Sequence, residues 1–340
     1  MNEILKLQQK LVPELLELLE KRYNILKNIY YNEPIGRRIL ANRLNMGERI
    51  VRTEVNFLKA QNLIEVNTPG MTVTDEGEEV LEELKNFIHE IKGLTEVELA
   101  LKEYLGLHDV VVVPGDADDD ESVRKEMGRA AANYIKSILK NDSIIALAGG
   151  STIKEIIDNF PKINSMPEVL VVPARGGMGR NVESQANTLA ASLANKLKCN
   201  YKMLHIPDNL SDKALNTILN ETEIKDVIDN IKNADILVYG IGKAEKMCYK
   251  RGLSEEKVNE ILNLGAIGEA YGCYFDKDGN VVYATSTVCV SREDTKNIKS
   301  IIAVAGGQNK SDAIVSTQIK STQGILITDE GAARKILENI

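Results

Sequence analysis

Residues 34–66, PIGRRILANRLNMGERIVRTEVNFLKAQNLIEV, contain two apolar patterns at helical spacing on either side of Asn45-Met46-Gly47. We expect the first helix to begin at Pro34, because the missing N–H of proline would have no partner in a first turn. Asn and Gly tolerate the backbone angles of a turn, so the triplet should end that helix. The apolar faces are Ile35, Ile39, Leu40 and Leu44, and then Ile50, Val51, Val55 and Leu58. This arrangement predicts a helix-turn-helix.

A short β-hairpin pattern follows the second helix. Residues 63–66 and 71–74 are strand-like and flank Thr68-Pro69-Gly70, which indicates two strands joined by a turn. A hairpin in this place is the wing of a winged helix-turn-helix, which lies along the flanking DNA backbone. Residues 1–20 suggest a further, amphipathic helix that packs on this domain or meets a partner chain.

The charge of this region agrees with DNA binding. Residues 21–62 carry nine basic and three acidic side chains, whereas the whole chain has a net charge of −8. A solvated charged face on a helical hairpin is the alternative, but the period, turn, wing and charge together favour attraction to a phosphate backbone. The candidates for base contacts are Glu48, Arg49, Arg52 and Thr53, with Asn56 on the same outward face, and those for phosphate contacts are Arg37, Arg38 and Arg43.

Length and composition bound the remaining possibilities. With 340 residues the chain is long enough for two domains, each with its own core. Its four cysteines form no CxxC pair and its three histidines are scattered, so we expect neither a metal site nor a disulfide framework. The first twenty residues hold several charges and no apolar signal core, and no run is long enough to span a bilayer. We therefore expect a cytoplasmic protein without membrane contact.

Three segments are expected along the chain. Residues 1–74 form the winged helix-turn-helix domain, residues 75–105 a helical linker broken near Gly93, and residues 106–340 an effector-binding domain. In the last segment, continuous apolar runs alternate with helical patterns, at residues 110–114, 143–148, 169–173, 235–239, 301–305 and 325–328. Such strands are buried on both faces, which predicts an α/β, Rossmann-like doubly wound parallel sheet. A smaller antiparallel piece is expected around residues 271–275 and 281–283, with its turn at Asp278-Gly279.

Glycine-rich loops follow several of these strands, where ligands bind in open α/β sheets. Gly149, Gly150, Ser151 and Thr152 precede a helix start and suit a phosphate. Further candidates for an anionic ligand are Arg175, Glu269, Gly306, Gly307 and Lys310. Arg175 with Lys310, and with Lys250 or Arg251, would suit two phosphates. Because Gly240-Ile241-Gly242 lacks a third glycine and no GxxxxGK[ST] loop exists, NAD and ATP are disfavoured and no cofactor is expected.

These motifs in order resemble the SorC/DeoR-type sugar-binding transcriptional regulators, and within them the repressors of glycolytic genes in Gram-positive bacteria. The motifs are Pro114-Gly-Asp116, residues 148–152, Pro173-Ala-Arg-Gly-Gly177, residues 239–242, residues 304–307 and Thr328-Asp-Glu-Gly331. The resemblance implies a repressor of the operon that encodes glyceraldehyde-3-phosphate dehydrogenase, with fructose 1,6-bisphosphate as inducer. It also implies an effector domain similar to glucosamine-6-phosphate deaminases and ribose-5-phosphate isomerases.

Carried over by position, the resemblance assigns Gly149, Ser151 and Thr152 to the phosphate loop and Arg175, Glu269 and Lys310 to the sugar. A further basic contact of the family falls at Lys250 or Arg251, and both remain open. Ser151 stands where close relatives are expected to have Thr, and its hydroxyl should serve.

A sugar-phosphate isomerase or deaminase with an appended DNA-binding domain is the alternative function. Proton transfer at a sugar carbon needs a positioned general base, and the Asp and His that the deaminases carry after this strand are replaced by Ala244 and Lys246. A sensor without catalytic residues is therefore favoured. We expect a homodimer or homotetramer whose paired winged domains bind operator DNA and whose affinity falls when a phosphosugar binds.

Overall fold

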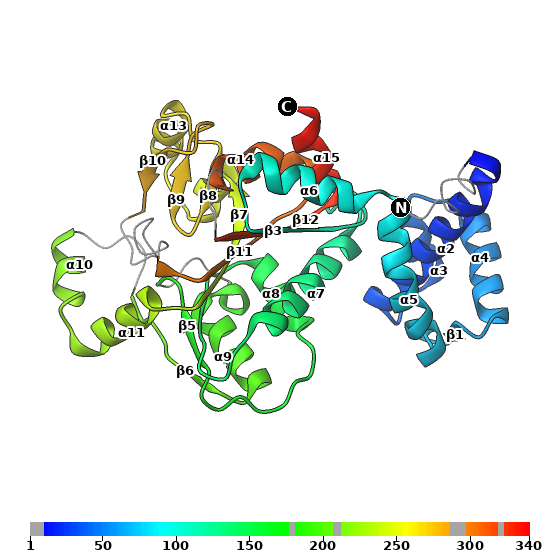
Figure 1. The fold of residues 1–340 in the computed structure, drawn as a ribbon, viewed down its shortest axis with the longest axis horizontal. Helices are drawn as coiled ribbons and strands as arrows, with labels where there is room; N and C mark the ends of the chain where they lie inside the picture. The colour runs from blue at the N-terminus through cyan, green and yellow to red at the C-terminus, as the bar shows by residue number, and fades with distance from the viewer. Residues whose placement is uncertain (1–9, 177–180, 207–211, 286–296, 319–322) are drawn as a thin grey trace. The chain divides into compact units, whose positions relative to one another are not determined.

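The computed structural model describes residues 10–176, 181–206, 212–285, 297–318 and 323–340 (Figure 1). The chain divides into two compact units, one of residues 1–97 with 119–123 and the other of residues 98–118 with 124–340. Helix α6, Leu94–Leu105, spans the first boundary between them. Each unit has its own core and is described by itself.

The first unit contains the predicted helix-turn-helix and wing. Its helices are α2, Pro13–Asn32, α3, Arg37–Arg43, α4, Glu48–Ala60, and α5, Asp75–Ile91. Strands β1, Ile64–Asn67, and β2, Gly70–Val73, pair antiparallel and form the wing. Leu40 from α3, Val51 and Val55 from α4 and Ile29 from α2 lie in one core with at most 1% exposure. The two predicted helices and the hairpin are thus confirmed.

The first helix of the motif begins later than predicted, at Arg37 instead of Pro34. Ile35 is paired with the wing: its N–H donates to the Met71 carbonyl at 3.1 Å, and the Met71 N–H donates back at 2.8 Å. Gly70 allows this close approach, because a Cβ on it would lie 2.8 Å from the Ile35 nitrogen and its φ is +149°. A backbone engaged in a β-bridge cannot also start a helix, so the prediction at Pro34 is wrong.

Two of the predicted inward side chains are exposed. Ile39 on α3 is 57% exposed and Ile50 on α4 is 49% exposed. Both helices are short, and their buried faces are narrower than the apolar pattern indicated. Of the amphipathic helix expected over residues 1–20, residues 1–9 lie outside the described part, and α2 begins at Pro13.

The second unit is built on a mostly parallel sheet, as predicted. Its parallel strands lie in the order β6, β5, β4, β7, β11, β12, β3. Their bounds are β3, Asp109–Val113, β4, Ile144–Leu147, β5, Leu170–Pro173, β6, Asn200–Tyr201, β7, Ile236–Lys243, β11, Ser300–Val304, and β12, Gly324–Asp329. Every residue of β12 is buried, which explains the apolar run Ile325-Leu326-Ile327 at its centre.

Helices cover this sheet and connect its strands. They are α7, Glu121–Ile138, α8, Ser151–Asp158, α9, Ala186–Leu197, α10, Asp212–Ile218, α11, Thr222–Lys232, α12, Ala244–Lys250, α13, Glu255–Asn263, α14, Ser311–Gln318, and α15, Glu330–Glu338, with short 3₁₀ turns at Val182–Ser184 and Gln308–Lys310. Helices α9 and α11 pack on β4 and β5, and α15 packs on β3 and β12. No helix among the described residues is long and apolar enough to cross a membrane.

Strand β7 continues further than predicted. The loop expected at residues 239–243 is strand up to Lys243, and its last residues pair antiparallel with β8, Gly268–Ala270. Strand β8 in turn pairs with β9, Cys273–Phe275, and β9 pairs with β10, Val281–Ala284. The antiparallel piece expected from the sequence is therefore present, and it joins the parallel sheet through the end of β7.

Candidate functional site

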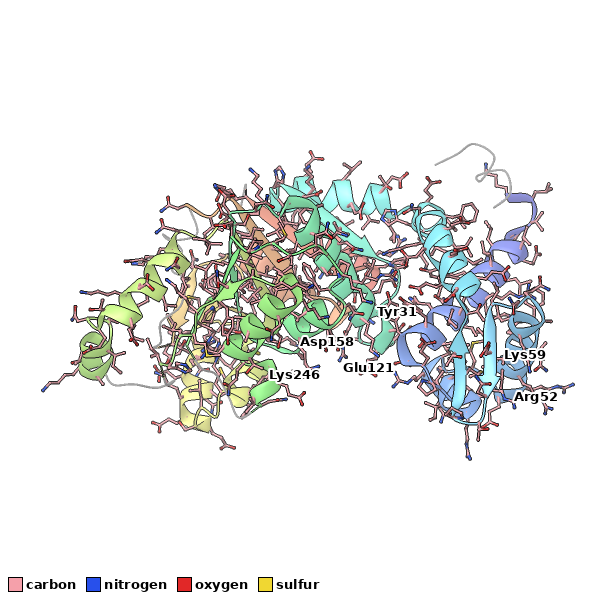
Figure 2. The ribbon with its side chains drawn as sticks, turned by 90° about the horizontal axis from the view of Figure 1, so that it is seen from below. Tyr31, Arg52, Lys59, Glu121, Asp158 and Lys246 are labelled. Carbon is pink, nitrogen blue, oxygen red and sulfur yellow. The ribbon has the colours of Figure 1, made fainter. Side chains whose placement is uncertain are left out.

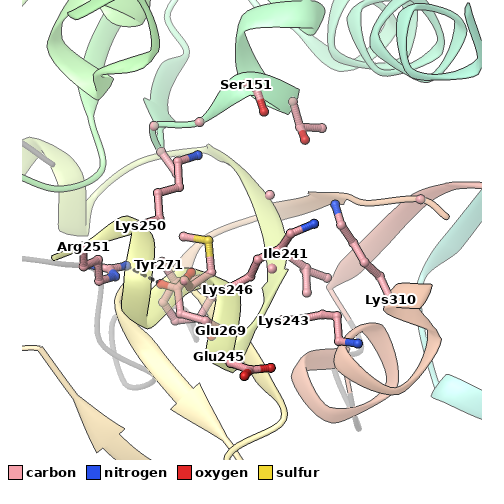
Figure 3. A pocket seen from close by; sticks show the side chains of 18 of the residues that line it. Ser151, Ile241, Lys243, Glu245, Lys246, Lys250, Arg251, Glu269, Tyr271 and Lys310 are labelled. Carbon is pink, nitrogen blue, oxygen red and sulfur yellow. Dashed lines mark hydrogen bonds and ion pairs between the residues drawn. The ribbon is translucent and has the colours of Figure 1, made fainter. Parts of the chain in front are cut away.

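A cavity of about 700 Å³ lies at the carboxyl ends of the parallel strands of the second unit. Its wall includes the loop after β4, the end of β7 with helix α12, and the segment after β11 (Figure 3). This volume is within the range of small-molecule sites. Of the effector residues predicted from the sequence, those that line the cavity are Gly149, Gly150, Ser151, Thr152, Arg175, Lys250, Arg251, Glu269, Gly306 and Lys310.

The loop after β4 presents the start of helix α8 to the cavity. Gly150 has a φ of +129°, which disfavours any other residue, and its N–H donates to the Ser184 carbonyl at 2.8 Å. No side chain caps α8, and the first amides of a helix have no partner within it. The amides and hydroxyls of Ser151 and Thr152 are therefore the groups that this loop offers an anion, while the Gly150 amide is already used.

The structure distinguishes the adjacent basic residues Lys250 and Arg251. The Arg251 side chain is 6% exposed and its Nη2 donates to Glu269 Oε1 at 2.5 Å. Lys250 is exposed, and Figure 3 shows its ammonium group directed toward the loop that carries Ser151. Lys250 therefore faces the Ser151 loop, whereas Arg251 is paired with Glu269.

Glu269 is held by the protein on one of its two carboxylate oxygens. Oε1 accepts from Arg251 and from the Gly272 N–H at 2.7 Å. The side chain is 4% exposed and borders the cavity. A fixed buried carboxylate at this position can accept hydrogen bonds from the hydroxyl groups of a sugar.

Lys310 lies at the opposite side of the cavity, immediately before helix α14. Partial burial lowers its pKa, and the positive charges of Arg124 and Lys246 lower that pKa further, against the carboxylates of Asp118 and Asp329. An anion bound beside Lys310 would stabilise the charged form of its ammonium group.

Asp329 fixes the glycine loop that leads to Lys310. Its Oδ2 accepts from the amides of Ala117 and Gly307 at 2.7 Å each, and its Oδ1 accepts from the Ala332 amide at 2.8 Å. Burial raises the pKa of Asp329 to about 6 although these three amides act to lower it. Gly307, predicted as a ligand contact, lies outside the cavity wall, and its amide is used by this carboxylate.

Several residues of the cavity wall were missed by the sequence analysis. They are Asp118, Arg124, Lys243, Lys246, Tyr271 and Asn309. Only Lys246 had a signal, because it follows a strand end at the position of a deaminase histidine. Lys243 and Asn309 lie within glycine-rich strand ends, but their side chains were not singled out there.

The first unit carries the predicted DNA-contacting residues on exposed faces. Arg49, Arg52, Thr53 and Asn56 are exposed along α4, and Figure 2 shows Arg52 projecting from the domain surface together with Lys59. Glu48 is exposed but forms an ion pair with Arg38 at 3.4 Å. Arg37 is exposed and Arg43 is half-buried.

Glu54 anchors α4 from its inner side. It accepts ion pairs from Lys21 at 2.6 Å and Arg22 at 2.9 Å, both on α2. Burial acts to raise the pKa of Glu54, but the hydrogen bonds from Lys21 and Arg22 outweigh it and the pKa is lowered. Lys21 and Arg22, two of the nine basic residues counted in the sequence, are thus held by Glu54, and Arg43 is paired with Glu121 of the same unit at 2.8 Å.

Comparisons with known proteins agree with this division of the chain. Residues 18–88 match the family described as "CggR N-terminal DNA binding domain", and residues 89–338 match the "Putative sugar-binding domain". The chain is 44% identical to the central glycolytic genes regulator of Priestia megaterium over 340 residues. The alignment covers 100% of this chain and 99% of the relative. This chain belongs to the central glycolytic genes regulators.

Further members and solved structures support the same family. The central glycolytic genes regulator of Bacillus subtilis is 42% identical over 339 residues, with 100% of both chains covered. A SorC family transcriptional regulator from Enterococcus faecalis superposes with a TM-score of 0.66 and 33% identity over 71% of this chain and 99% of its own. The full-length sorbitol operon regulator of Klebsiella pneumoniae, at 19% identity and a TM-score of 0.66 over 92% of this chain and 96% of its own, shares the fold.

Membership in the central glycolytic genes regulators resolves the choice between enzyme and sensor. The relatives are named transcriptional regulators, and the first unit of this chain matches a DNA-binding family. The chain is a regulator with a DNA-binding domain and a sugar-binding α/β domain.

Proposed function

We propose that the protein represses the operon that encodes glyceraldehyde-3-phosphate dehydrogenase, and that fructose 1,6-bisphosphate releases it from the operator. The names of the two closely similar regulators support the glycolytic assignment. The operator would be bound in the cytoplasm by paired winged domains of a homodimer or homotetramer.

The observation that carries the choice of ligand is the charge of the cavity. Among the residues that the structure describes, seven basic side chains line it, against the three carboxylates of Asp118, Glu245 and Glu269. The basic ones are Arg124, Arg175, Lys243, Lys246, Lys250, Arg251 and Lys310. Of the three carboxylates, Glu269 is paired with Arg251. This surplus of positive charge favours a ligand that carries more than one phosphate.

Residues of different types would divide the ligand between them. The start of α8, with Ser151 and Thr152, would hold a phosphate with the help of Lys250. Glu269 would accept sugar hydroxyl groups. No cofactor is part of this proposal, since the cavity wall offers charged groups for an anion and lacks a dinucleotide fingerprint.

The alternative of a sugar-phosphate isomerase or deaminase receives less support. A carboxylate needs a partner such as histidine to act as a positioned general base. The described residues of the cavity wall include no histidine, and Glu269 is already bound by Arg251. Turnover of ribose 5-phosphate or glucosamine 6-phosphate by the purified protein would restore this alternative.

Regulation requires that the ligand bind one arrangement of the effector domains better than another, because equal affinity for both would shift nothing. The test is fluorescence anisotropy of the full chain on a labelled promoter fragment of the glycolytic operon. Fructose 1,6-bisphosphate should raise the dissociation constant for DNA, whereas unphosphorylated fructose should leave it unchanged. Equal DNA affinity with and without the bisphosphate would contradict the proposal.

A further inference from the structure

The first turn of α4, the second helix of the winged motif, carries an exposed apolar side chain. Ile50 is 49% exposed, although the apolar pattern of the sequence placed it inward, and the adjacent Val51 is fully buried. Gly47, which precedes the helix, has no side chain that could cover Ile50: the position its Cβ would take lies 4.0 Å from Ile50 Cδ1. In helix-turn-helix proteins this end of the second helix contacts base edges, so Ile50 lies where DNA is read.

A second large apolar side chain exposed on α4, Phe57, has a different setting. The guanidinium carbon of Arg22, on α2, lies 3.5 Å from the centre of the Phe57 ring. Arg22 is held there by its ion pair with Glu54 at 2.9 Å. The exposure of Phe57 is therefore explained by a stacking contact within the domain, and Ile50 lies about two turns closer to the start of the helix.

Thr53, one turn after Ile50, presents its methyl group outward. The side chain is exposed, but its hydroxyl donates to the Arg49 carbonyl at 3.0 Å and is thereby used within the helix. The sequence favoured Thr53 as a polar base contact, whereas this bond leaves the Cγ2 methyl as the group offered to a partner. Residues three apart are neighbours on a helix surface, so Ile50 and this methyl form an apolar pair.

We propose that Ile50 and Thr53 contact the 5-methyl group of a thymine in the major groove, and that this contact sets part of the base preference of the protein. The 5-methyl group is the apolar feature by which thymine differs from the other bases in that groove. Arg49 and Arg52 are exposed on the same helix, and their charges complement the phosphates of DNA. An apolar protein partner would have to bury these charges, which is costly.

The proposal goes beyond the proposed function. It requires the DNA-binding domain that the first unit matches, but it depends neither on the glycolytic operon nor on a phosphosugar. It also assigns Thr53 a specific chemistry, because its methyl group and not its hydroxyl would read the base.

The test compares thymine with uracil, which lacks the 5-methyl group and pairs in the same way. The full wild-type chain first selects a high-affinity duplex from a random-sequence pool, and that duplex is then synthesised with deoxyuridine in place of thymidine. Fluorescence anisotropy gives the dissociation constants for both duplexes. Wild type should bind the uracil duplex about fourfold more weakly for each contacted methyl group. In Ile50→Ala this ratio of dissociation constants should fall toward one.

Two substitutions of Thr53 separate its methyl group from its hydroxyl. Thr53→Val keeps a methyl group in place and removes the hydroxyl, so it should retain the wild-type ratio. Thr53→Ser keeps the hydroxyl and removes the methyl group, so its ratio should be lower than that of wild type. Ile39→Ala is the matched control, because Ile39 is 57% exposed on α3 and loses the same atoms. It should leave the ratio unchanged, even if the affinity for both duplexes shifts equally.

A wild-type ratio of one would overturn the thymine contact, and so would equal ratios in wild type and Ile50→Ala. An exchange of the results for Thr53→Val and Thr53→Ser would show that the hydroxyl is read instead. A pool from which no sequence is enriched would also contradict the inference, since no base would then be distinguished. These outcomes leave the proposed response to fructose 1,6-bisphosphate untouched, because it is measured by the effect of the sugar on DNA affinity.

Discussion

Arg251 and Glu269 form a buried ion pair in the wall of the effector cavity, with Nη2 and Oε1 2.5 Å apart and side chains 6% and 4% exposed. Arg251 lies next to Lys250 in the sequence, yet the two side chains have different surroundings. The arginine fixes a carboxylate inside the wall, and the lysine stays accessible to a ligand.

Replacing Arg251 by Met leaves Glu269 buried and without its cationic partner. Breaking one side of a buried pair costs about 3 to 5 kcal/mol, so the free energy of unfolding should fall by that order. Urea denaturation followed by circular dichroism measures it. Lys250→Met, one position away, should leave the unfolding free energy within about 0.5 kcal/mol of wild type. Similar losses in both variants would show that the ion pair is not what stabilises this wall.

Lys250→Met should instead weaken phosphosugar binding. If Lys250 reaches the phosphate at the Ser151 loop, the variant should lose roughly tenfold or more in affinity for mono- and bisphosphates alike. If Lys250→Met binds fructose 1,6-bisphosphate as tightly as wild type, Lys250 does not contact the phosphate at the Ser151 loop.

Asp329 should make stability depend on pH in a defined direction. Its pKa is raised to about 6 in the folded state. Between about pH 4 and pH 6 the folded protein therefore keeps a proton on Asp329 that the unfolded chain has already released. The stability from this carboxyl group is present below about pH 4 and is lost as the pH rises through about 6, by about 2 to 3 kcal/mol in total. The difference in unfolding free energy between wild type and Asp329→Asn should therefore be larger at pH 4 than at pH 7. A difference that is constant, or that grows with pH, would contradict the assignment.

Two arginines of the winged domain should separate base contacts from phosphate contacts. Arg52 is exposed along α4, so Arg52→Ala should relax the preference at a base position by about 1 to 3 kcal/mol. Arg37 precedes the turn of the motif, and Arg37→Ala should weaken binding to all sequences and reduce the slope of log affinity against log salt by about one. Binding assays on a specific and a scrambled fragment at several salt concentrations measure both. If Arg37→Ala relaxed the base preference and Arg52→Ala only reduced the salt slope, Arg37 would be the base contact and Arg52 the phosphate contact.

The sequence was sufficient for the parallel sheet and the winged domain because their signals are local. A run such as residues 325–327 is apolar at every position, as expected for a strand that is buried on both faces. Glycines before a helix start located the Ser151 loop for a similar reason. The start of α3 was missed because the pairing of Ile35 with Met71 joins residues far apart in the chain.

The roles of Lys250 and Arg251 could not be separated from sequence. Successive residues in a helix point about 100° apart, so neighbours of equal charge face different surroundings. Which of them meets Glu269 depends on where strand β8 lies beside β7. Arg124 and Lys246 were missed for the same reason, since their shared position next to Lys310 arises only when separate segments fold onto one sheet edge.

The account depends on coupling between the phosphosugar cavity and DNA binding, and such coupling is reciprocal. The most direct measurement is the dissociation constant of fructose 1,6-bisphosphate for the full chain, determined by calorimetry without DNA and with saturating operator DNA. If the sugar releases the repressor, operator DNA should weaken sugar binding by the same factor by which the sugar weakens DNA binding. Identical sugar affinities in the two titrations would show that the cavity does not control the DNA-binding domain.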